Sequence, residues 1–288
     1  MSTVPPMLNV LSIDVEDWYQ VAALAPTVPR DSWATREGRV ERSVERLLEL
    51  LARRSLRATF FVLGWTAERH PRLVPGIVAA GHEIGSHGWS HRNIYEQSPA
   101  EFREETLRSR RLLQDQSGQP VTGYRAASFS VTAASLWALD VLIDAGFDYD
   151  SSVFPIRHDR YGLPGASTTP GRIAAPSGRT LVEFPMSTAH WLGQRVPVCG
   201  GGYFRILPYG LVRRGLRQIN AGQGQPFCFY LHPWEIDPGQ PRVPAGAVSR
   251  FRHYTGLERC ERRLERLLGE FRFGTMREVL ADLGLVTR

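Results

Sequence analysis

The chain has 288 residues, 42% of them hydrophobic and 10% aromatic, a composition that excludes a disordered or fibrous protein. Its formal net charge is +6, and all 35 basic residues are arginines. This charge either attracts an anionic glycan, a pyrophosphate-linked lipid carrier or a membrane surface, or it belongs to solvated arginines on surface helices, and no motif supports nucleic-acid binding.

The first third of the chain alternates short apolar runs with helical patterns. Residues 10–13 and 58–63 are apolar runs that predict buried strands. Between them, a helix is predicted from apolar residues that share one helical face, namely Val40, Val44, Leu47, Leu48 and Leu51. A short helix over 73–80 and a third strand over 82–86 follow.

The same alternation continues further along the chain. Ser98, Pro99 and Glu101 form a capping-box pattern that opens a helix to about residue 116. The later elements are a strand over 123–126, a helix over 135–145 that Gly146 ends, and strands near 181–184 and 228–231. A salt-bridged surface helix is expected over 258–270, and surface excursions that break the strand–helix alternation over 155–179 and 238–249.

We expect one α/β domain over residues 1–288. Strand–helix alternation with continuous apolar strands predicts parallel strands covered by helices. The core is expected over about 8–235, with a C-terminal elaboration over about 236–288. Polar residues follow several predicted strands, where α/β barrel enzymes place their active sites.

The chain offers few signals of membrane insertion or export. It has no run of about 18 uncharged apolar residues, so a transmembrane helix is not expected. Residues 1–10 lack a basic region followed by an apolar one, so we expect no secretory signal and a cytoplasmic location. Cys199, Cys228 and Cys260 are widely separated, which favours reduced structural thiols over a catalytic cysteine.

The strongest local signal is the segment 86–91, SHGWSH. His87 and His91, at i and i+4, can lie on one face of a helical turn and supply two imidazole nitrogens to one metal. Chance and core histidines also explain such pairs. The pair is therefore a candidate metal site that needs a second signal.

Three acids, Asp14, Glu16 and Asp17, cluster at the end of the first predicted strand. Neighbouring acids repel one another unless a cation lies among them, although exposed acids at a helix N-cap are an alternative explanation. Period-two alternation puts Asp14 and Glu16 on one side of the strand, and Asp17 joins them only if the chain turns. One acid with two histidines leaves a zinc position open for water, as hydrolysis requires.

Two further polar residues follow later predicted strands. Arg125 could hold a general-base carboxylate through a bidentate pair, or it could form a structural ion pair. His232 could protonate a leaving amine, or it could be a core histidine with satisfied hydrogen bonds.

These residues resemble the motifs of the NodB-type polysaccharide deacetylases, carbohydrate esterase family 4. Segment 81–91 looks like the family's second motif with its two metal histidines, and 11–18 resembles the first. Segments similar to the third, fourth and fifth motifs follow in the family's order, at 123–129, 148–152 and 231–233. The resemblance runs from about residue 8 to 235 and is strongest to the branch associated with exopolysaccharide and exosortase (PEP-CTERM) loci.

Two positions depart from the family pattern. The family's adjacent aspartates are replaced by Asp14-Val15-Glu16-Asp17, so the acid metal ligand is either Glu16 or Asp17. Ala127 stands where proline is usual.

The resemblance implies a distorted (β/α) barrel of about seven parallel strands that removes N-acetyl groups from a glycan. It implies a divalent metal, zinc or else iron, cobalt or nickel, held by His87, His91 and the acid ligand. Asp14, positioned by Arg125, would be the general base.

The remaining roles implied by the resemblance concern the leaving group and the substrate. His232 would protonate the departing amine, and a backbone N–H near Ala127 or Ser128 would stabilise the oxyanion. Asp150, Ser151 and Ser152 would support the site through hydrogen bonds. Several aromatic side chains would either stack on sugar rings or pack in the core, namely Trp89, Tyr203, Phe204, Trp234 and Tyr254.

Two other functions remain open. The chain could be an amidohydrolase acting on a small linear or cyclic amide, or an inactive glycan-binding relative. The expected partner is an N-acetylated bacterial polysaccharide or its precursor, and the oligomeric state is not specified. Segment 200–202, three glycines, is either a loop that closes over substrate or a tight turn.

Overall fold

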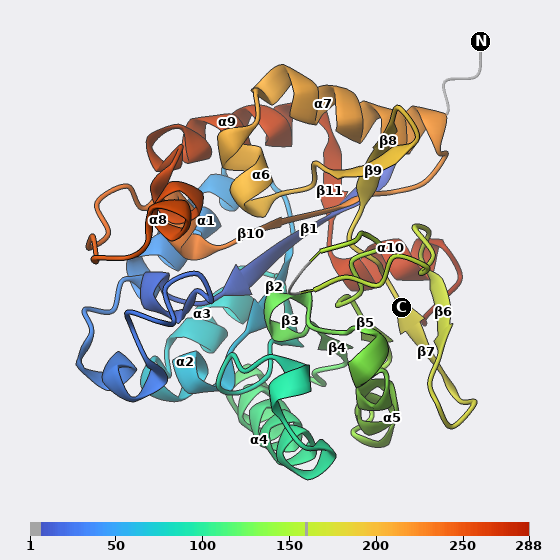
Figure 1. The fold of residues 1–288 in the computed structure, drawn as a ribbon, viewed down its shortest axis with the longest axis horizontal. Helices are drawn as coiled ribbons and strands as arrows, with labels where there is room; N and C mark the ends of the chain where they lie inside the picture. Colours follow the sequence, from blue (N-terminus) through green and yellow to red (C-terminus); the bar gives the residue numbers. More distant parts are fainter. Residues whose placement is uncertain (1–6, 159–160, 288) are drawn as a thin grey trace.

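The computed structural model describes residues 7–158 and 161–287. Residues 1–6, part of the start for which no secretory signal is expected, lie outside it, as do residues 159–160 of the predicted surface excursion. A nine-stranded sheet crosses the centre of the molecule, and helices surround it (Figure 1). Eight of its strands are parallel. Seven of these lie in the order β10 (Cys228–Leu231), β1 (Leu8–Val15), β2 (Thr59–Val62), β3 (Glu83–Ser86), β4 (Gly123–Tyr124), β5 (Tyr149–Asp150) and β7 (Thr180–Glu183), and the eighth, β11 (Arg272–Gly274), pairs with β1.

The predicted α/β architecture with a mostly parallel central sheet is therefore confirmed. Over the described residues, the hydrogen-bonded order begins at β10 and ends at β6 (Gly171–Ala174), which pairs antiparallel with β7. β6 lies within the predicted surface excursion over 155–179, where the sequence analysis expected no strand. This strand alternates half-buried and exposed residues next to turns rich in glycine and proline, so it lacks the apolar run that marks a buried strand.

The C-terminal segment joins the sheet at its central strand. β11 (Arg272–Gly274) pairs in parallel with the first residues of β1, and β10 pairs with β1 from Val10 to Ile13. Both partners reach Val10, so they lie on opposite edges of β1. β11 therefore pairs with the same edge of β1 with which β2 pairs from Ser12 onward. A separate hairpin consists of β8 (Thr188–Trp191) and β9 (Gln194–Pro197).

Ten α-helices are present in the described chain, and several match the predicted ones. The longest, α4, runs from Pro99 to Ser117 and begins with the predicted capping box of Ser98 and Glu101. The others are α1 (Val40–Ala52), α2 (Gly64–Arg69), α3 (Leu73–Ala79), α5 (Trp137–Asp144), α6 (Gly201–Ile206), α7 (Tyr209–Arg217), α8 (Ala247–Tyr254), α9 (Leu257–Glu270) and α10 (Met276–Asp282). In the described part of the chain, no helix has the length and apolar character needed to cross a bilayer.

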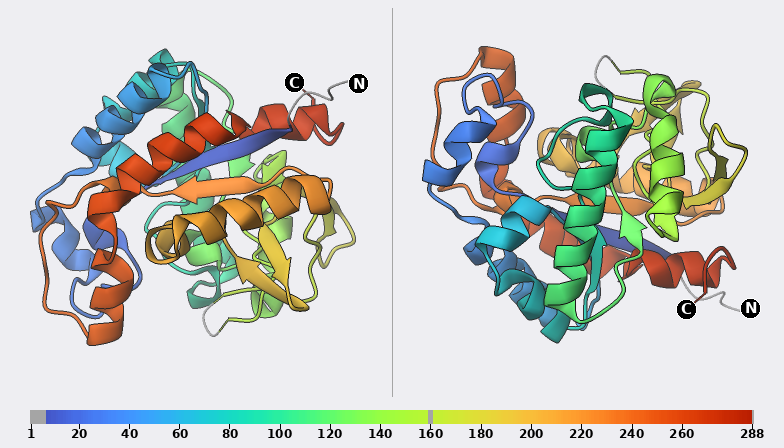
Figure 2. Two further views of the ribbon diagram at one scale, coloured as in Figure 1. Left: turned by 90° about the horizontal axis from the view of Figure 1, so that it is seen from above. Right: turned by 90° about the horizontal axis from the view of Figure 1, so that it is seen from below.

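Most helices lie around the outside of the sheet (Figure 2) and pack against one face of it, whereas α10 packs with Val10 of the other face. α1 buries the face that carries Val44 and Leu47, and α9 buries Leu264 and Leu267 in the same cluster. The carboxyl ends of the parallel strands meet at one edge, so the side chains that follow β1, β3, β4 and β10 converge there.

Candidate active site

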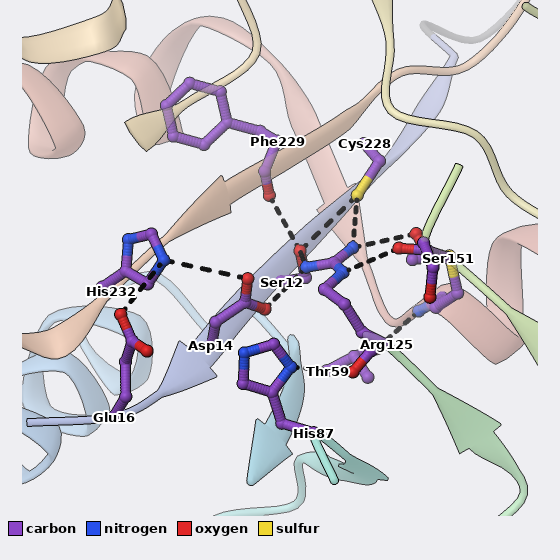
Figure 3. Close-up of polar contacts among 12 residues, drawn as sticks. Ser12, Asp14, Glu16, Thr59, His87, Arg125, Ser151, Cys228, Phe229 and His232 are labelled. Atoms are coloured by element: carbon purple, nitrogen blue, oxygen red, sulfur yellow. Dashed lines mark hydrogen bonds and ion pairs between the residues drawn. The ribbon is translucent and has the colours of Figure 1, made fainter. Parts of the chain in front are cut away.

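Five predicted site residues meet at the carboxyl edge of the sheet. Asp14 lies on β1 and Glu16 directly after it, while His87, Arg125 and His232 follow β3, β4 and β10. Figure 3 shows the Asp14 carboxylate between the Arg125 guanidinium and the His232 ring. Four of the five side chains are almost fully buried, and His232 is the most exposed of them.

Glu16, His87 and His91 form the candidate metal group. One ligand atom from each lies within 4.8 Å of the other two, and all three residues are buried. The histidines do not share a helical turn as predicted. The chain after β3 is irregular because Gly88 (φ 75°) and His91 (φ 52°) adopt left-handed conformations, and this turn brings the two imidazoles together.

The protonation of His87 suits metal binding. Its Nδ1 lies 2.8 Å from the carbonyl oxygen of Arg125, and because a carbonyl only accepts, Nδ1 carries the proton. Nε2 is then left with a lone pair, as a metal ligand requires. Burial lowers the pKa of His87 to about 4, so the ring is neutral at pH 7.

Glu16 supplies the acid of the group. Nε1 of Trp234 donates to its Oε1 at 3.1 Å, and Nε2 of His91 lies 2.8 Å from its Oε2. Oε2 is nevertheless buried without a donor of good hydrogen-bond geometry among the described residues. Burial alone would raise the pKa of Glu16, but the histidines around it, led by His91 and His232, lower it below its usual range. An ionised carboxylate with an oxygen that lacks a well-directed donor, beside two imidazoles, fits a divalent cation.

Asp17 lies outside this group, so the alternative that it is the acid ligand is not supported by the structure. Its Oδ1 accepts from the backbone N–H of Trp18 at 2.8 Å. Its Oδ2 accepts from the N–H groups of Arg39 and Val40 at 2.7 and 3.1 Å. Asp17 thus satisfies backbone donors at the start of α1, which is a structural role.

Asp14 and Arg125 form a buried ion pair. Nη1 of Arg125 donates to Oδ1 of Asp14 at 2.7 Å. The pair has one such bond and is not the predicted bidentate one, because the other donors of the guanidinium are used elsewhere. Nε and Nη2 donate to the carbonyl and hydroxyl oxygens of Ser151 at 3.0 and 2.9 Å, and Nη2 contacts Sγ of Cys228. The hydroxyl of Ser12 also accepts from Nη1.

The loop after β4 is supported by segment 148–152, which resembles the family's fourth motif. The Ser152 hydroxyl accepts from the backbone N–H of Ala126 at 2.7 Å and donates to Asp150. Asp150 is buried close to Glu183, and burial raises the pKa of both carboxyl groups. These contacts hold the segment that carries Arg125 and Ser128.

His232 belongs to a chain of charged residues that the sequence analysis did not predict. Its Nδ1 lies 3.0 Å from Oε2 of Glu235, whose Oε1 accepts from Nε of Arg205 at 2.6 Å. Its Nε2 lies 3.6 Å from Glu16 and 4.0 Å from Asp14. Burial opposes protonation, but Glu16 and Glu235 outweigh it and raise the pKa of His232 to about 9. A capping box between His232 and Glu235, at i and i+3, is the sequence signal for this pairing.

A cleft of about 510 Å³ opens beside these residues, within the usual range for ligand sites. His232, Ser128, Tyr203 and Trp234 line it. A larger cavity of about 890 Å³ lies among residues that precede strands, such as His82, and none of the predicted site residues line it.

Two of the predicted sugar-stacking residues are core residues instead. Trp89 is buried, with Gly64 under its ring and the Arg108 guanidinium 3.5 Å from the ring centre. Phe204 is fully buried edge-to-face against Phe229. Both positions depend on packing against elements distant in sequence, so the local motif contained no sign of burial.

Trp234 and Tyr254 both contact His253. The Trp234 ring stacks between His232 and His253, with centroid distances of 5.2 and 4.4 Å. The Tyr254 hydroxyl donates to the carbonyl of Pro241. Tyr203 is half-buried at the cleft and is the aromatic residue of the predicted set best exposed to it.

Family models match almost the whole described chain in two parts. Residues 31–149 match the model described as polysaccharide deacetylase, and residues 151–281 match a domain of unknown function, DUF3473. A peptidoglycan deacetylase of Helicobacter pylori is 28% identical over 152 residues, 53% of this chain and 47% of that protein. A chitooligosaccharide deacetylase of Bradyrhizobium sp. is 30% identical over 96 residues, 33% of this chain and 42% of that protein.

The chain spans about half the length, or less, of these curated relatives. Residues 31–149 are thus similar to the polysaccharide deacetylase family, and both relatives are named as deacetylases. The members of this family are metalloenzymes, in agreement with the group of Glu16, His87 and His91.

Solved structures of three kinds share the fold. One is a Mycobacterium smegmatis protein classed as a polysaccharide deacetylase (TM-score 0.64, 21% identity, 98% of this chain and 92% of that chain). Another is PuuE allantoinase (TM-score 0.61, 16% identity, 96% and 90%). The third is a carbohydrate esterase family 4 pseudoenzyme from Bacillus anthracis (TM-score 0.51, 14% identity, 96% and 66%). At these identities the likeness concerns the fold alone.

Proposed function

We propose that the protein is a metal-dependent deacetylase that hydrolyses N-acetyl groups of a bacterial glycan and releases acetate. The observation that carries the proposal is the meeting of the group Glu16, His87 and His91 with the Asp14–Arg125 pair and His232. A metal site, a base and an acid are the parts that hydrolysis of an amide needs. The family match over 31–149 supports the same reaction.

Asp14 is the proposed general base. Arg125 holds its Oδ1, so the carboxylate keeps one orientation, and its Oδ2 faces His232. Arg125 in turn donates hydrogen bonds to Ser151. The carboxylate of Asp14 is therefore fixed by a series of hydrogen bonds that runs through Arg125 to Ser151. A carboxylate held in this way can take the proton of an attacking water without moving.

Glu16, His87 and His91 are proposed to hold zinc. Two imidazoles and a carboxylate are a typical catalytic zinc set, although iron, cobalt and nickel accept the same donors. When bound, a divalent ion supplies Lewis acidity to the amide carbonyl and to water.

His232 is the proposed general acid. Its raised pKa keeps the ring protonated at neutral pH, with Nδ1 toward Glu235 and Nε2 toward Asp14 and Glu16. Nε2 can therefore donate its proton to a departing sugar amine. A backbone N–H near Ala127 or Ser128 is proposed to stabilise the oxyanion, because Ser128 borders the cleft.

The proposed substrate is an N-acetylated exopolysaccharide or its precursor. Deacetylases named for peptidoglycan and for chitooligosaccharide are among the relatives, and both of those substrates carry N-acetylated sugars. A cytoplasmic location remains part of the proposal, as does the exopolysaccharide role.

The fold does not choose between the proposed activity and its two alternatives. An allantoinase and a pseudoenzyme share the fold. The competing functions are therefore hydrolysis of a small cyclic amide and the absence of any catalytic activity. The joint presence of Asp14, Arg125, His232 and the ligand group favours an active hydrolase, since glycan binding alone needs none of them.

The test is acetate release by the purified, zinc-loaded protein. We expect acetate from N-acetylglucosamine oligosaccharides or peptidoglycan fragments, its loss after chelation, and its return with zinc. The control is the Asp14→Asn variant under the same conditions. Ring opening of allantoin with no acetate from any glycan, or no reaction of the loaded protein with either class, would overturn the proposal.

A further inference from the structure

An apolar and basic patch lies beside the catalytic cleft. Val248 and Phe251, one turn apart on α8, are 64% and 56% exposed. Phe251 also lines the cleft, together with Ile206 of α6. Neighbouring apolar side chains exposed in this way indicate an interaction surface. Together with Arg250 and Arg252 of the same helix, Val248 and Phe251 are named here the α8 patch.

The patch is positively charged. Segment 238–257 contains Arg242, Arg250 and Arg252 and no aspartate or glutamate. Within the described chain, none of these arginines forms an ion pair with a carboxylate, whereas Arg46 of α1 pairs with an acid on α9. The charge of the α8 patch is therefore available to an anionic partner.

The helix that carries the patch is anchored from beneath. Among the residues of α8, His253 is the fully buried one, and its Nε2 lies 2.7 Å from Oε1 of Gln240. Nη1 of Arg205 donates to the carbonyl oxygen of His253 at 2.9 Å. The exposed side chains are thus displayed on a fixed support and can be replaced without disturbing the core.

We propose that the α8 patch docks the protein onto an anionic membrane surface. In a short amphipathic helix of this kind, the apolar side chains enter the lipid interface while the arginines meet lipid phosphates. Val248 and Phe251, with Arg250 and Arg252 beside them, match both parts of that surface. The described helices cannot span a bilayer, so the contact is peripheral.

Docking in this orientation has a consequence for catalysis. α8 lies at the end of the molecule toward which the β1 arrow points (Figure 1), and its Phe251 and Arg252 line the cleft. The cleft then meets glycans held at the membrane. This consequence rests on the proposed function, whereas docking itself does not.

The experiment measures co-sedimentation of the full chain with vesicles, which needs no substrate. The protein should bind phosphatidylcholine vesicles that contain phosphatidylglycerol, should bind pure phosphatidylcholine more weakly, and should be released by salt. Val248→Ser with Phe251→Ser should lower binding roughly tenfold or more, because two apolar side chains no longer enter the interface. Arg250→Gln with Arg252→Gln should lower it by a similar factor.

Matched control variants distinguish binding through the α8 patch from binding through exposed apolar or basic side chains elsewhere on the chain. Leu192→Ser removes a fully exposed apolar side chain at the β8–β9 turn, and Arg214→Gln with Arg217→Gln removes two exposed charges from α7. Both controls should bind like the wild type. Equal losses in controls and patch variants, or no preference for anionic vesicles, would overturn the proposal. So would a dimer that the Val248/Phe251 variant dissociates, since the patch would then bind a second copy of the chain.

Discussion

Three acids within four positions have three different roles because their surroundings differ. Asp14 faces a guanidinium, Glu16 faces imidazoles, and Asp17 faces backbone N–H groups. Only the first two meet groups that could take part in chemistry. At the scale of the residue, the partner of a carboxylate decides its role.

Metal content should distinguish Glu16 from Asp17. Glu16→Gln and His87→Ala should lose most bound zinc after dialysis, because each removes one of three protein ligands. Asp17→Asn should keep the metal but lower the free energy of unfolding by about 1 kcal/mol through weakened hydrogen bonds to backbone donors. Metal analysis and chemical denaturation measure the two effects. Zinc lost from Asp17→Asn and kept by Glu16→Gln would reverse the assignment.

Turnover should distinguish Asp14 from the metal ligands. Asp14→Asn should lower kcat roughly 10²–10⁴-fold, the usual contribution of a positioned base, while metal content stays close to that of the wild type. The buried Arg125 loses its counter-charge, so the variant should also unfold at lower temperature. Activity is therefore compared where circular dichroism shows both proteins folded. A parallel loss of zinc would make Asp14 a ligand.

Substrate chemistry should test His232. His232→Ala should lose roughly 10²–10⁴-fold in kcat on an N-acetyl sugar and far less on an aryl acetate, whose leaving group needs no proton. Because deprotonation removes the acid, wild-type activity on the amide should fall as pH rises through the pKa of His232, which the neighbouring carboxylates hold above its usual value. The residual amide activity of the variant should lack that decline. Equal losses on both substrates would indicate a structural histidine.

At the scale of the element, short segments at strand ends do more for the site than the long helices. β4 and β5 have two residues each, yet they carry the segments with Arg125 and Ser151. α6 begins beside β10, through a bridge between Gly200 and Tyr230, and this contact places Arg205 behind Glu235. Such elements depend on close backbone approach, which glycine permits.

Alanine substitution should show that the three glycines at 200–202 differ. Gly200 has a φ of 128°, and a Cβ there would overlap the carbonyl oxygen of Tyr230, so Gly200→Ala should cost about 2 kcal/mol or more. Gly202 lies within α6, where the nearest atom to a Cβ is 3.8 Å away, so Gly202→Ala should be neutral or stabilising. Urea denaturation measures both. Equal stability of the two variants would contradict a tight turn at Gly200.

At the scale of the whole molecule, the two segments matched by separate family models build one sheet. β1 precedes both segments and pairs with β2 of the first segment and with β10 and β11 of the second. β5 and β7 join the segments again on the other side. The prediction of a single domain can therefore be tested by dividing the chain where the two models meet.

Fragments 1–150 and 151–288 should not fold separately. Each would expose strand edges and apolar faces that the other covers in the intact chain. Neither fragment alone should unfold cooperatively on heating, whereas the intact chain should, and mixing the fragments should recover part of the transition. Cooperative unfolding of either isolated fragment would mean that the chain has two domains.

The sequence by itself determined the elements whose signal is local. The apolar run at β10, the helical face of α1 and the capping box of α4 depend on neighbours a few residues away, and all three are present. It also placed Asp14, Glu16, His87, Arg125 and His232 at the ends of parallel strands, which meet at one edge of the sheet.

Only the tertiary structure decided what depends on contacts between distant segments. Asp17 binds backbone donors more than twenty residues away, and Trp89 is buried because α4 covers it with Arg108. The link from His232 through Glu235 to Arg205 joins α6 to the end of β10. A side chain's local sequence does not specify whether a distant donor, ring or helix will reach it, so these roles followed from packing.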